Sequence, residues 1–475
     1  MAPPPTLGRR LANEFGLTTL SKSSRDIYLL LLTRFLRMIA YGSSTLVLAL
    51  FFSALNFSDA QIGLFMSLTL IGDVLISLAL TLVADALGRR RILVLGALLM
   101  TFSGVVFTTT QNYWVLLFAA VVGVISPSGN EIGPFRAVEE STIAQLTEAD
   151  TRSDVFAWYV VFGTLGTAGG SLACGWATQA LQAKGWSELS SFRLIFGVYA
   201  VIGVVKAAVS LGLSQACESH PPARTEDEYE LVAAEESEEQ QPMLDEDDPD
   251  HEDPAPPQSP PKPKQKKPTI STLSPNSLRT LLKLCALFSV DSLASGMVPN
   301  SLITLFMNRK FTLPIGKLGT IISTTAFVSS IGNIAASSIA KRIGLVKTMV
   351  FTHLPSAIFL ALFPLPGSLG LSVALLVARA SLASMDQAPR SAFLSAVVLP
   401  EERTAVMGIV NTVKTLSQSG GPLVTGGLAT GGHFWVAFVL AGALKAAYDM
   451  GMLGMFVNVR LEGEKRKELS LGAEG

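Results

Sequence analysis

The stretch TEDEYELVAAEESEEQQPMLDEDDPDHEDPAPPQSPPKPKQKK, residues 225–267, divides the chain into two apolar halves. It is the centre of a polar segment, residues 218–277, that carries 16 of the 37 acidic residues and only five of the 36 Lys and Arg residues. Such a composition cannot bury a hydrophobic core, so the segment is predicted to be a disordered linker. The fold must therefore be built from the sequence on either side of it.

The two halves are too apolar for a soluble protein of this size. The chain of 475 residues is 49% hydrophobic and 15% charged, with a mean hydropathy of +0.45, which indicates a membrane protein. Its net charge of −1 hides a linker of −11 and a remainder of +10, and a basic body suits cytoplasmic membrane faces. The cysteines, Cys174, Cys217 and Cys285, have no paired spacing, which predicts neither a disulfide framework nor a metal site.

Twelve apolar runs are each long enough for a helix that crosses a bilayer, for which about 20 residues are needed. Six precede the linker, at roughly 27–55, 62–84, 92–110, 114–134, 155–181 and 194–216, and six follow it, at roughly 278–308, 318–340, 349–366, 371–398, 406–429 and 434–459. The prediction is an all-α polytopic membrane protein with twelve transmembrane helices. Its parts are an N-terminal tail (1–26), a six-helix bundle (27–217), the linker (218–277), a second six-helix bundle (278–459) and a C-terminal tail (460–475).

Basic residues in the short loops orient the chain. Arg89, Arg90, Arg91, Arg152 and Arg403 fall in loops on the same side as both tails and the linker, and positive loops face the cytosol. Both termini are therefore expected in the cytosol. Lys and Arg residues also occur in two loops of the outer side, which weakens this orientation without reversing it.

The two halves repeat each other at a nearly constant spacing. Gly169-Gly170 matches Gly420-Gly421 at an offset of 251, Gly42 matches Gly296 at 254, and Glu131-x-x-Pro134 matches Asp386-x-x-Pro389 at 255. Matches in the same chain order indicate two parallel, pseudo-symmetric copies of a six-span unit. This is an architecture of secondary transporters, with the substrate site between the copies.

The loop after the second run reads Thr81-Leu-Val-Ala-Asp85-Ala-Leu-Gly88-Arg89-Arg90-Arg91. Asp85, Gly88, Arg89 and Arg90 resemble the cytosolic loop motif of the major facilitator superfamily, although that family has a glycine where this chain has Thr81. The resemblance implies the fold of that family and a cytosolic gate in which Asp85 pairs with the neighbouring bundle in one conformation. The alternative is that the arginines only determine topology.

Glycines are concentrated in the fifth and eleventh runs. They allow helices to approach closely, and packing is the role expected of Gly169, Gly170, Gly420, Gly421 and Pro422. They resemble the antiporter motif of the superfamily's exporters only loosely.

Charged residues within apolar runs are the functional candidates, since each costs a few kcal/mol in a membrane unless it is paired or hydrated. The resemblance places most of them on helices that line the central cavity. Lys445 and Asp449, four residues apart, can instead pair with each other, and Arg34 or Glu140 can reach an interface. The predicted cavity residues are Arg37, Glu131, Arg136, Asp291, Asp386, Arg390 and Lys414.

Two hypotheses concern coupling. Glu131 and Asp386 are expected to include a residue that binds a proton during transport, because carboxylates in a poorly hydrated cavity titrate nearer to neutral pH. Arg37 and Asp291, each five residues before the aligned glycines Gly42 and Gly296, are expected to form a pair that closes in one state and opens in another. A permanent structural bridge is the alternative.

The predicted function is secondary active transport of a small polar or ionic organic solute by alternating access, coupled to protons, with export favoured by the resemblance. The alternatives are a proton-coupled uptake carrier and a transport-inactive sensor or scaffold. No sequence motif supports an enzyme, a cofactor, ATP hydrolysis or nucleic-acid binding. The expected partners are the solute, protons, the lipid bilayer and sorting adaptors that recognise Tyr229-x-x-Val232 or residues 239–244, and the expected location is the plasma membrane or a vacuolar or endosomal membrane.

Overall fold

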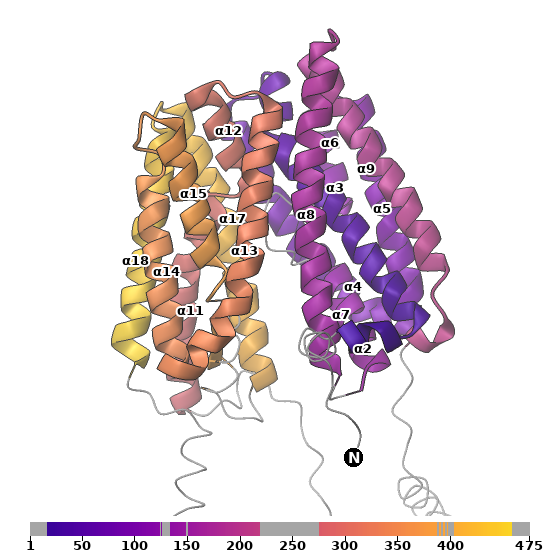
Figure 1. Ribbon diagram of the computed structural model, residues 1–475, viewed down its shortest axis with the longest axis vertical. Helices are drawn as coiled ribbons and strands as arrows, with labels where there is room; N and C mark the ends of the chain where they lie inside the picture. The colour runs from indigo at the N-terminus through magenta and orange to yellow at the C-terminus, as the bar shows by residue number, and fades with distance from the viewer. Residues whose placement is uncertain are drawn as a thin grey trace, which may run out of the picture.

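A computed structural model describes residues 17–123, 125, 134–148, 151–218, 275–386, 389–390, 393–394, 397 and 403–457. Within these ranges the regular structure is helical and contains no strand. The helices form two bundles side by side, one from each half of the sequence (Figure 1). Residues 1–16, 219–274 and 458–475, which hold most of the predicted tails and linker, lie outside the described ranges.

The first bundle, the N bundle, begins with a short helix inside the predicted tail. In chain order its elements are α2 (Leu17–Lys22), α3 (Arg25–Ala54), α4 (Asp59–Leu87), α5 (Arg89–Thr109), α6 (Tyr113–Val122), α7 (Pro134–Leu146), α8 (Arg152–Ala183), α9 (Glu188–Leu211) and the 3-10 turn η1 (Gln215–Cys217).

The second bundle, the C bundle, repeats this plan. It consists of α11 (Pro275–Met297), α12 (Asn300–Phe311), α13 (Ile315–Ile343), α14 (Leu345–Leu362), α15 (Leu369–Ala383), α17 (Arg403–Thr430) and α18 (Phe434–Phe456). In the part of the chain that is described, eight helices are long and apolar enough to cross a membrane, and α6 and α15 are shorter apolar helices.

Three of the predicted runs differ from the observed helices. In place of the fourth run, α6 ends at Val122 and a further helix, α7, begins at Pro134 and ends at Leu146. Proline is favoured in the first turn of a helix, which fits the start of α7. The seventh run divides at Pro299, between α11 and α12, since proline cannot donate the backbone hydrogen bond of a helix interior. The tenth run's first helix, α15, ends at Ala383.

Equivalent tight turns join the second membrane span to the third in each bundle, α4 to α5 and α13 to α14. Gly88 (φ 93°) precedes α5 and Gly344 (φ 88°) precedes α14. A side chain is strained in this left-handed region, so the turn explains why both halves keep a glycine at this point. The repeat is therefore visible in backbone conformation as well as in sequence.

The bundles are apolar on the outside as well as in their cores. Leu75, Trp114, Phe118 and Leu416 are all more than 60% exposed, whereas charged residues including Asp73, Glu139, Lys206, Asp291 and Asp449 are buried. This inverts the pattern of a soluble protein and matches a bilayer environment.

The two bundles contact each other at the end that carries the loops after α3, α8 and α12, which we call the loop end; the other end, with residue 17 and residue 457, is the tail end (Figure 1). A Cβ on Gly63 of α4 would lie 3.0 Å from the Cα of Gly426 in α17, and one on Gly175 of α8 would lie 2.9 Å from the Cα of Gly319 in α13. Arg309 of the C bundle also donates two hydrogen bonds of 2.8 Å to the carboxylate of Asp59 in the N bundle.

Candidate functional site

A buried network of ion pairs and hydrogen bonds joins four helices of the N bundle. Arg37 Nη2 on α3 lies 2.5 Å from Glu139 Oε2 on α7, and Lys206 Nζ on α9 lies 3.8 Å from Glu139 Oε1. The Tyr159 hydroxyl on α8 donates to Glu139 Oε2 at 2.7 Å. Glu139 is fully buried, and its charge is offset by two cations and one hydroxyl. We call these four residues the N network.

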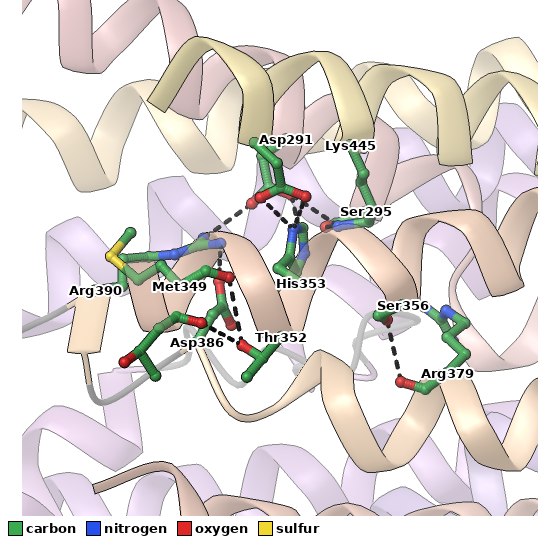
Figure 2. A network of polar contacts seen from close by, with 12 residues as sticks. Asp291, Ser295, Met349, Thr352, His353, Ser356, Arg379, Asp386, Arg390 and Lys445 are labelled. Atoms are coloured by element: carbon green, nitrogen blue, oxygen red, sulfur yellow. Dashed lines mark hydrogen bonds and ion pairs between the residues drawn. The ribbon is translucent and has the colours of Figure 1, made fainter. Parts of the chain in front are cut away.

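A second network, the C network, lies in the other bundle (Figure 2). Asp291 on α11 accepts from Lys445 Nζ on α18 at 2.8 Å and from Arg390 Nη1 at 2.9 Å. Arg390 also forms an ion pair with Asp386, and its guanidinium stacks over the rings of Phe288 and Tyr448. His353 on α14 and Asp449 on α18 complete the network behind Asp291.

The two networks are pseudo-symmetric, but two of their charges are exchanged. Asp291 corresponds to Arg37 at an offset of 254, and each of the two is bound by a residue from the fourth span of its bundle, Glu139 in one and Arg390 in the other. Each network contains one lysine from the last helix of its bundle, Lys206 or Lys445. In both bundles, the first, fourth and sixth spans are therefore tied together by an acid held between two cations.

The predicted cavity residues fall into three groups. Arg37, Asp291, Asp386 and Arg390 are members of the networks. Arg136 Nε instead pairs with Glu140 on the same helix at 2.6 Å, with both side chains at least one-third exposed. Glu131 lies outside the described residues.

Lys414, the remaining candidate, has no carboxylate partner among the described residues. It lies on α17 with its ammonium 5.5 Å from the ring centroid of Phe288, on which Arg390 also stacks at 5.3 Å. Its side chain is half-buried. An ammonium in this position can receive an anionic group from a ligand.

Arg37 and Asp291, the expected pair between bundles, are each held within their own bundle. The suggestion that Lys445 and Asp449 pair with each other is wrong: Lys445 binds Asp291 and Ser295, and Asp449 binds His353. Arg34 does not reach an interface but is buried, with its guanidinium 4.6 Å from the ring centroid of Tyr159.

Sequence reasoning did not predict a cavity role for Glu139, Lys206, Tyr159 or His353. Lys206 and His353 lie on helices α9 and α14, away from those expected to line a cavity. Their roles depend on contacts between helices.

The residues of the predicted gate lie at the tail end of the N bundle. Gly88 begins α5, Arg89 Nη1 donates to Gln145 Oε1 on α7 at 2.7 Å, and Gln145 donates to the carbonyl of Glu218 at 2.7 Å. Arg90 Nε is buried. The side chain of Asp85 in α4 lies outside the described parts of the structure. The described partners of Arg89 thus belong to its own bundle.

The predicted packing glycines differ from one another. A Cβ on Gly170 would lie 2.1 Å from the carbonyl oxygen of Ile39, and one on Gly421 would lie 2.2 Å from the carbonyl carbon of Gly296. A Cβ on Gly420 would lie 3.3 Å from Leu293, whereas Gly169 has open space at this position, so no helix contact depends on Gly169. The carbonyl of Pro422 packs on Gly63 in the other bundle.

Within the described residues, no group of three or more His, Cys, Asp or Glu side chains is placed to hold a metal ion. The networks themselves offer charges, hydrogen bonds and groups that can exchange protons. Buried charges of both signs, arranged on facing helices within a membrane, are typical of sites for ions, protons and polar solutes.

Comparison with known proteins agrees with this architecture. The family model of the Major Facilitator Superfamily matches residues 30–290 and 284–473. The uncharacterized membrane protein YJR124C of Saccharomyces cerevisiae is 36% identical over 447 residues, which cover 94% of this chain and 97% of that protein.

Solved transporters share the fold at low sequence identity. A bacterial homolog of the human lysosomal transporter Spinster, in an inward-facing and unoccupied conformation, aligns with a TM-score of 0.60 and 17% identity over 90% of this chain and 94% of that one. The nucleoside transporter NupG gives 0.61 and 15% over 92% and 100%. The inward-open xylose transporter XylE of E. coli gives 0.62 and 14% over 90% and 96%.

Proposed function

The chain belongs to the major facilitator superfamily, and from this premise we propose that it is a secondary active transporter that moves a small polar or ionic organic solute by alternating access. The observation that carries the proposal is the pair of buried charge networks, one in each bundle. Because the described contacts of each network lie within one bundle, rocking of the two bundles leaves these contacts in place.

The solute is proposed to carry an anionic group, such as a carboxylate or phosphate. Lys414 supports this, because it is a half-buried cation beside the C network that no carboxylate of the described chain neutralises. Desolvating an unpaired ammonium is costly, and an anionic ligand would offset that cost. Arg390 is already held by Asp291 and Asp386.

Protons are proposed as the coupling ion, because carboxylates at both networks lie deep within the apolar body. The contacts between bundles at the loop end support a conformation that is open at the tail end. With the positive-inside orientation of the loops, this is an inward-facing state with both termini in the cytosol. Export remains the favoured direction and uptake the alternative; the plasma membrane and a vacuolar or endosomal membrane are the proposed locations.

The first experiment is a thermal-shift screen of the purified protein with carboxylates, phosphate esters, amines and neutral sugars. A ligand at 100 times its Kd stabilises the folded state by about 2.7 kcal/mol. We expect anionic compounds to raise the melting temperature of the wild type and not that of Lys414→Gln. Lys283→Gln, which changes an exposed lysine of α11, is the matched control. A shift by amines or neutral sugars alone would contradict an anionic solute.

The second experiment separates transport from the sensor or scaffold alternative. Proteoliposomes with an imposed pH gradient are expected to accumulate the compounds that shift the melting temperature. No accumulation, together with recovery of cytosolic proteins that depends on residues 226–267, would favour a scaffold. Loss of surface delivery alone, after these residues are replaced by a short Gly/Ser tether, would support the sorting signals.

A further inference from the structure

His353, a member of the C network, lies beside Asp291, between Arg390 and Lys445 (Figure 2). It lies on α14 and is only 4% exposed. Its Nδ1 is 3.0 Å from both carboxylate oxygens of Asp449, and its Nε2 is 3.8 Å from Asp291 Oδ1. The first distance is that of a hydrogen bond, whereas the second is longer than one but within the range of a direct ion pair. One imidazole thus separates two carboxylates from different helices.

The helices packed around this imidazole differ in the charged groups that they present to it. Helix α18 presents Lys445, Tyr448 and Asp449, and α11 presents Asp291. Asp386 and Arg390 follow α15, whose own titratable residue, Arg379, accepts a hydrogen bond from Ser356 of α14 through its backbone carbonyl. Residues 319–332 of α13 contain no titratable side chain.

The direct contacts of this cluster give Asp449 a histidine, His353, rather than a lysine or arginine as its described partner. Asp291, Asp386 and Asp449 can supply three negative charges, whereas Arg390 and Lys445 supply two positive charges. Lys414 makes no ion pair with any of them. Burying an uncompensated charge is expensive, so a proton shared by His353 and Asp449 would offset the charge of Asp449.

We propose that His353 and Asp449 form a proton relay behind Asp291 and store the proton that drives transport. This inference rests on the proton coupling proposed above. A proton that reaches Asp291 is transferred when its O–H bond breaks and the Nε2–H bond of His353 forms, while the Nδ1–H proton passes to Asp449. The net result is an ionised Asp291, again able to bind Arg390 and Lys445, and a protonated Asp449.

The geometry sets one condition for this step. Asp291 Oδ1 must approach Nε2 by about 0.6 Å to reach the upper limit of a normal hydrogen bond. Lys445 Nζ binds this same oxygen at 2.8 Å, so the approach is expected when Lys445 releases Oδ1, which would couple proton transfer to a change in the packing of α18 against α11. The Nδ1 side already has hydrogen-bond length.

The test is to measure the protonation of His353 directly by NMR of the full-length protein labelled at histidine. The chain has four histidines, His220, His251, His353 and His433, and His353→Gln identifies the signal. We expect its imidazole to change from the Nδ1–H to the Nε2–H tautomer as the pH falls, and Asp449→Asn to abolish this change. An imidazole that keeps one tautomer over the whole pH range in which the protein stays folded would overturn the relay.

A second measurement separates exchange from a structural role. The pH profile of the melting temperature is expected to change in both His353→Gln and Asp449→Asn and to be unchanged in His433→Gln, whose side chain is exposed. A uniform fall in melting temperature with an unchanged pH profile would show that His353 only packs. Neither measurement uses a solute or a proton gradient. Failure here would contradict the relay alone, whereas the expected tautomer change without proton-driven accumulation would contradict the proposed coupling.

Discussion

Glu139 is the carboxylate that neutralises the cations of the N network. It is fully buried and is contacted by Arg37, Lys206 and Tyr159. Glu139→Gln leaves two cations without their anion, which is expected to destabilise the protein by about 3–5 kcal/mol. Neighbouring Glu140 is one-third exposed and pairs with Arg136 on the same helix, so Glu140→Gln is expected to cost less than about 1 kcal/mol. Melting temperatures of the two purified variants measure the difference, and equal values would contradict a structural N network.

The exchanged charges of the two networks predict a rescue. Arg37→Glu or Glu139→Arg alone brings like charges together in a buried position. The double variant places an acid on α3 and an arginine on α7, which is the arrangement that Asp291 and Arg390 have in the C bundle. We expect each single variant to lose folded protein and the double variant to regain much of it, as measured by the monodisperse fraction after purification. A double variant no better than the worse single variant would refute the equivalence of the networks.

At the scale of helices, close contact between α3 and α8 depends on one glycine of an adjacent pair. A Cβ on Gly170 would lie 2.1 Å from the backbone oxygen of Ile39, whereas one on Gly169 would meet nothing within 4 Å. Gly170→Ala must therefore separate the helices, at an expected cost of about 1–3 kcal/mol. Gly169→Ala is the matched control and should be neutral or slightly stabilising. Equal melting temperatures would mean that the helices adjust without cost.

Sequence periodicity predicted the elements better than it predicted their contacts. Hydrophobic runs of bilayer length locate the helices to within a few residues, because length and apolarity are local requirements of a membrane. Two differences from the predicted runs lie at prolines: the seventh run is divided at Pro299, and the helix α7 begins at Pro134. Whether Lys445 pairs with Asp449 or with Asp291, however, depends on how α18 is rotated against α11. That rotation is a property of packing, which one sequence does not reveal.

At the scale of the molecule, the repeat predicted the two bundles and their parallel order. It also aligned Arg37 with Asp291 correctly as equivalent positions, but equivalence by pseudo-symmetry does not require contact. The described ion pairs of each residue lie inside its own bundle, because neighbouring helices bring opposite charges close enough there to offset their desolvation. Among the described residues, an ion pair between the bundles is formed at the loop end, by Asp59 and Arg309.

This loop-end pair makes a prediction about the conformational equilibrium. Arg309 donates to both oxygens of Asp59 at 2.8 Å, and the two side chains are 39% and 16% exposed. A partly exposed pair of this kind contributes about 0.2–1 kcal/mol, enough to change the ratio of two states by up to about fivefold. Asp59→Asn is thus expected to increase the population that is open at the loop end and closed at the tail end.

The population can be measured without a transported solute, from distances between spin labels on Lys22→Cys and Lys283→Cys at the tail end. Both positions are exposed, one on each bundle, and two of the native cysteines, Cys174 and Cys217, are buried. Asp59→Asn should add a shorter distance to the distribution, and high salt should reproduce part of this change in the wild type, because salt screens exposed pairs. Gln61→Ala, a change on the same helix that leaves Asp59 and Arg309 in place, is the control. If the distribution of Asp59→Asn matches that of the control, then the glycine contacts between α4 and α17 and between α8 and α13, rather than the ion pair, hold the loop end closed.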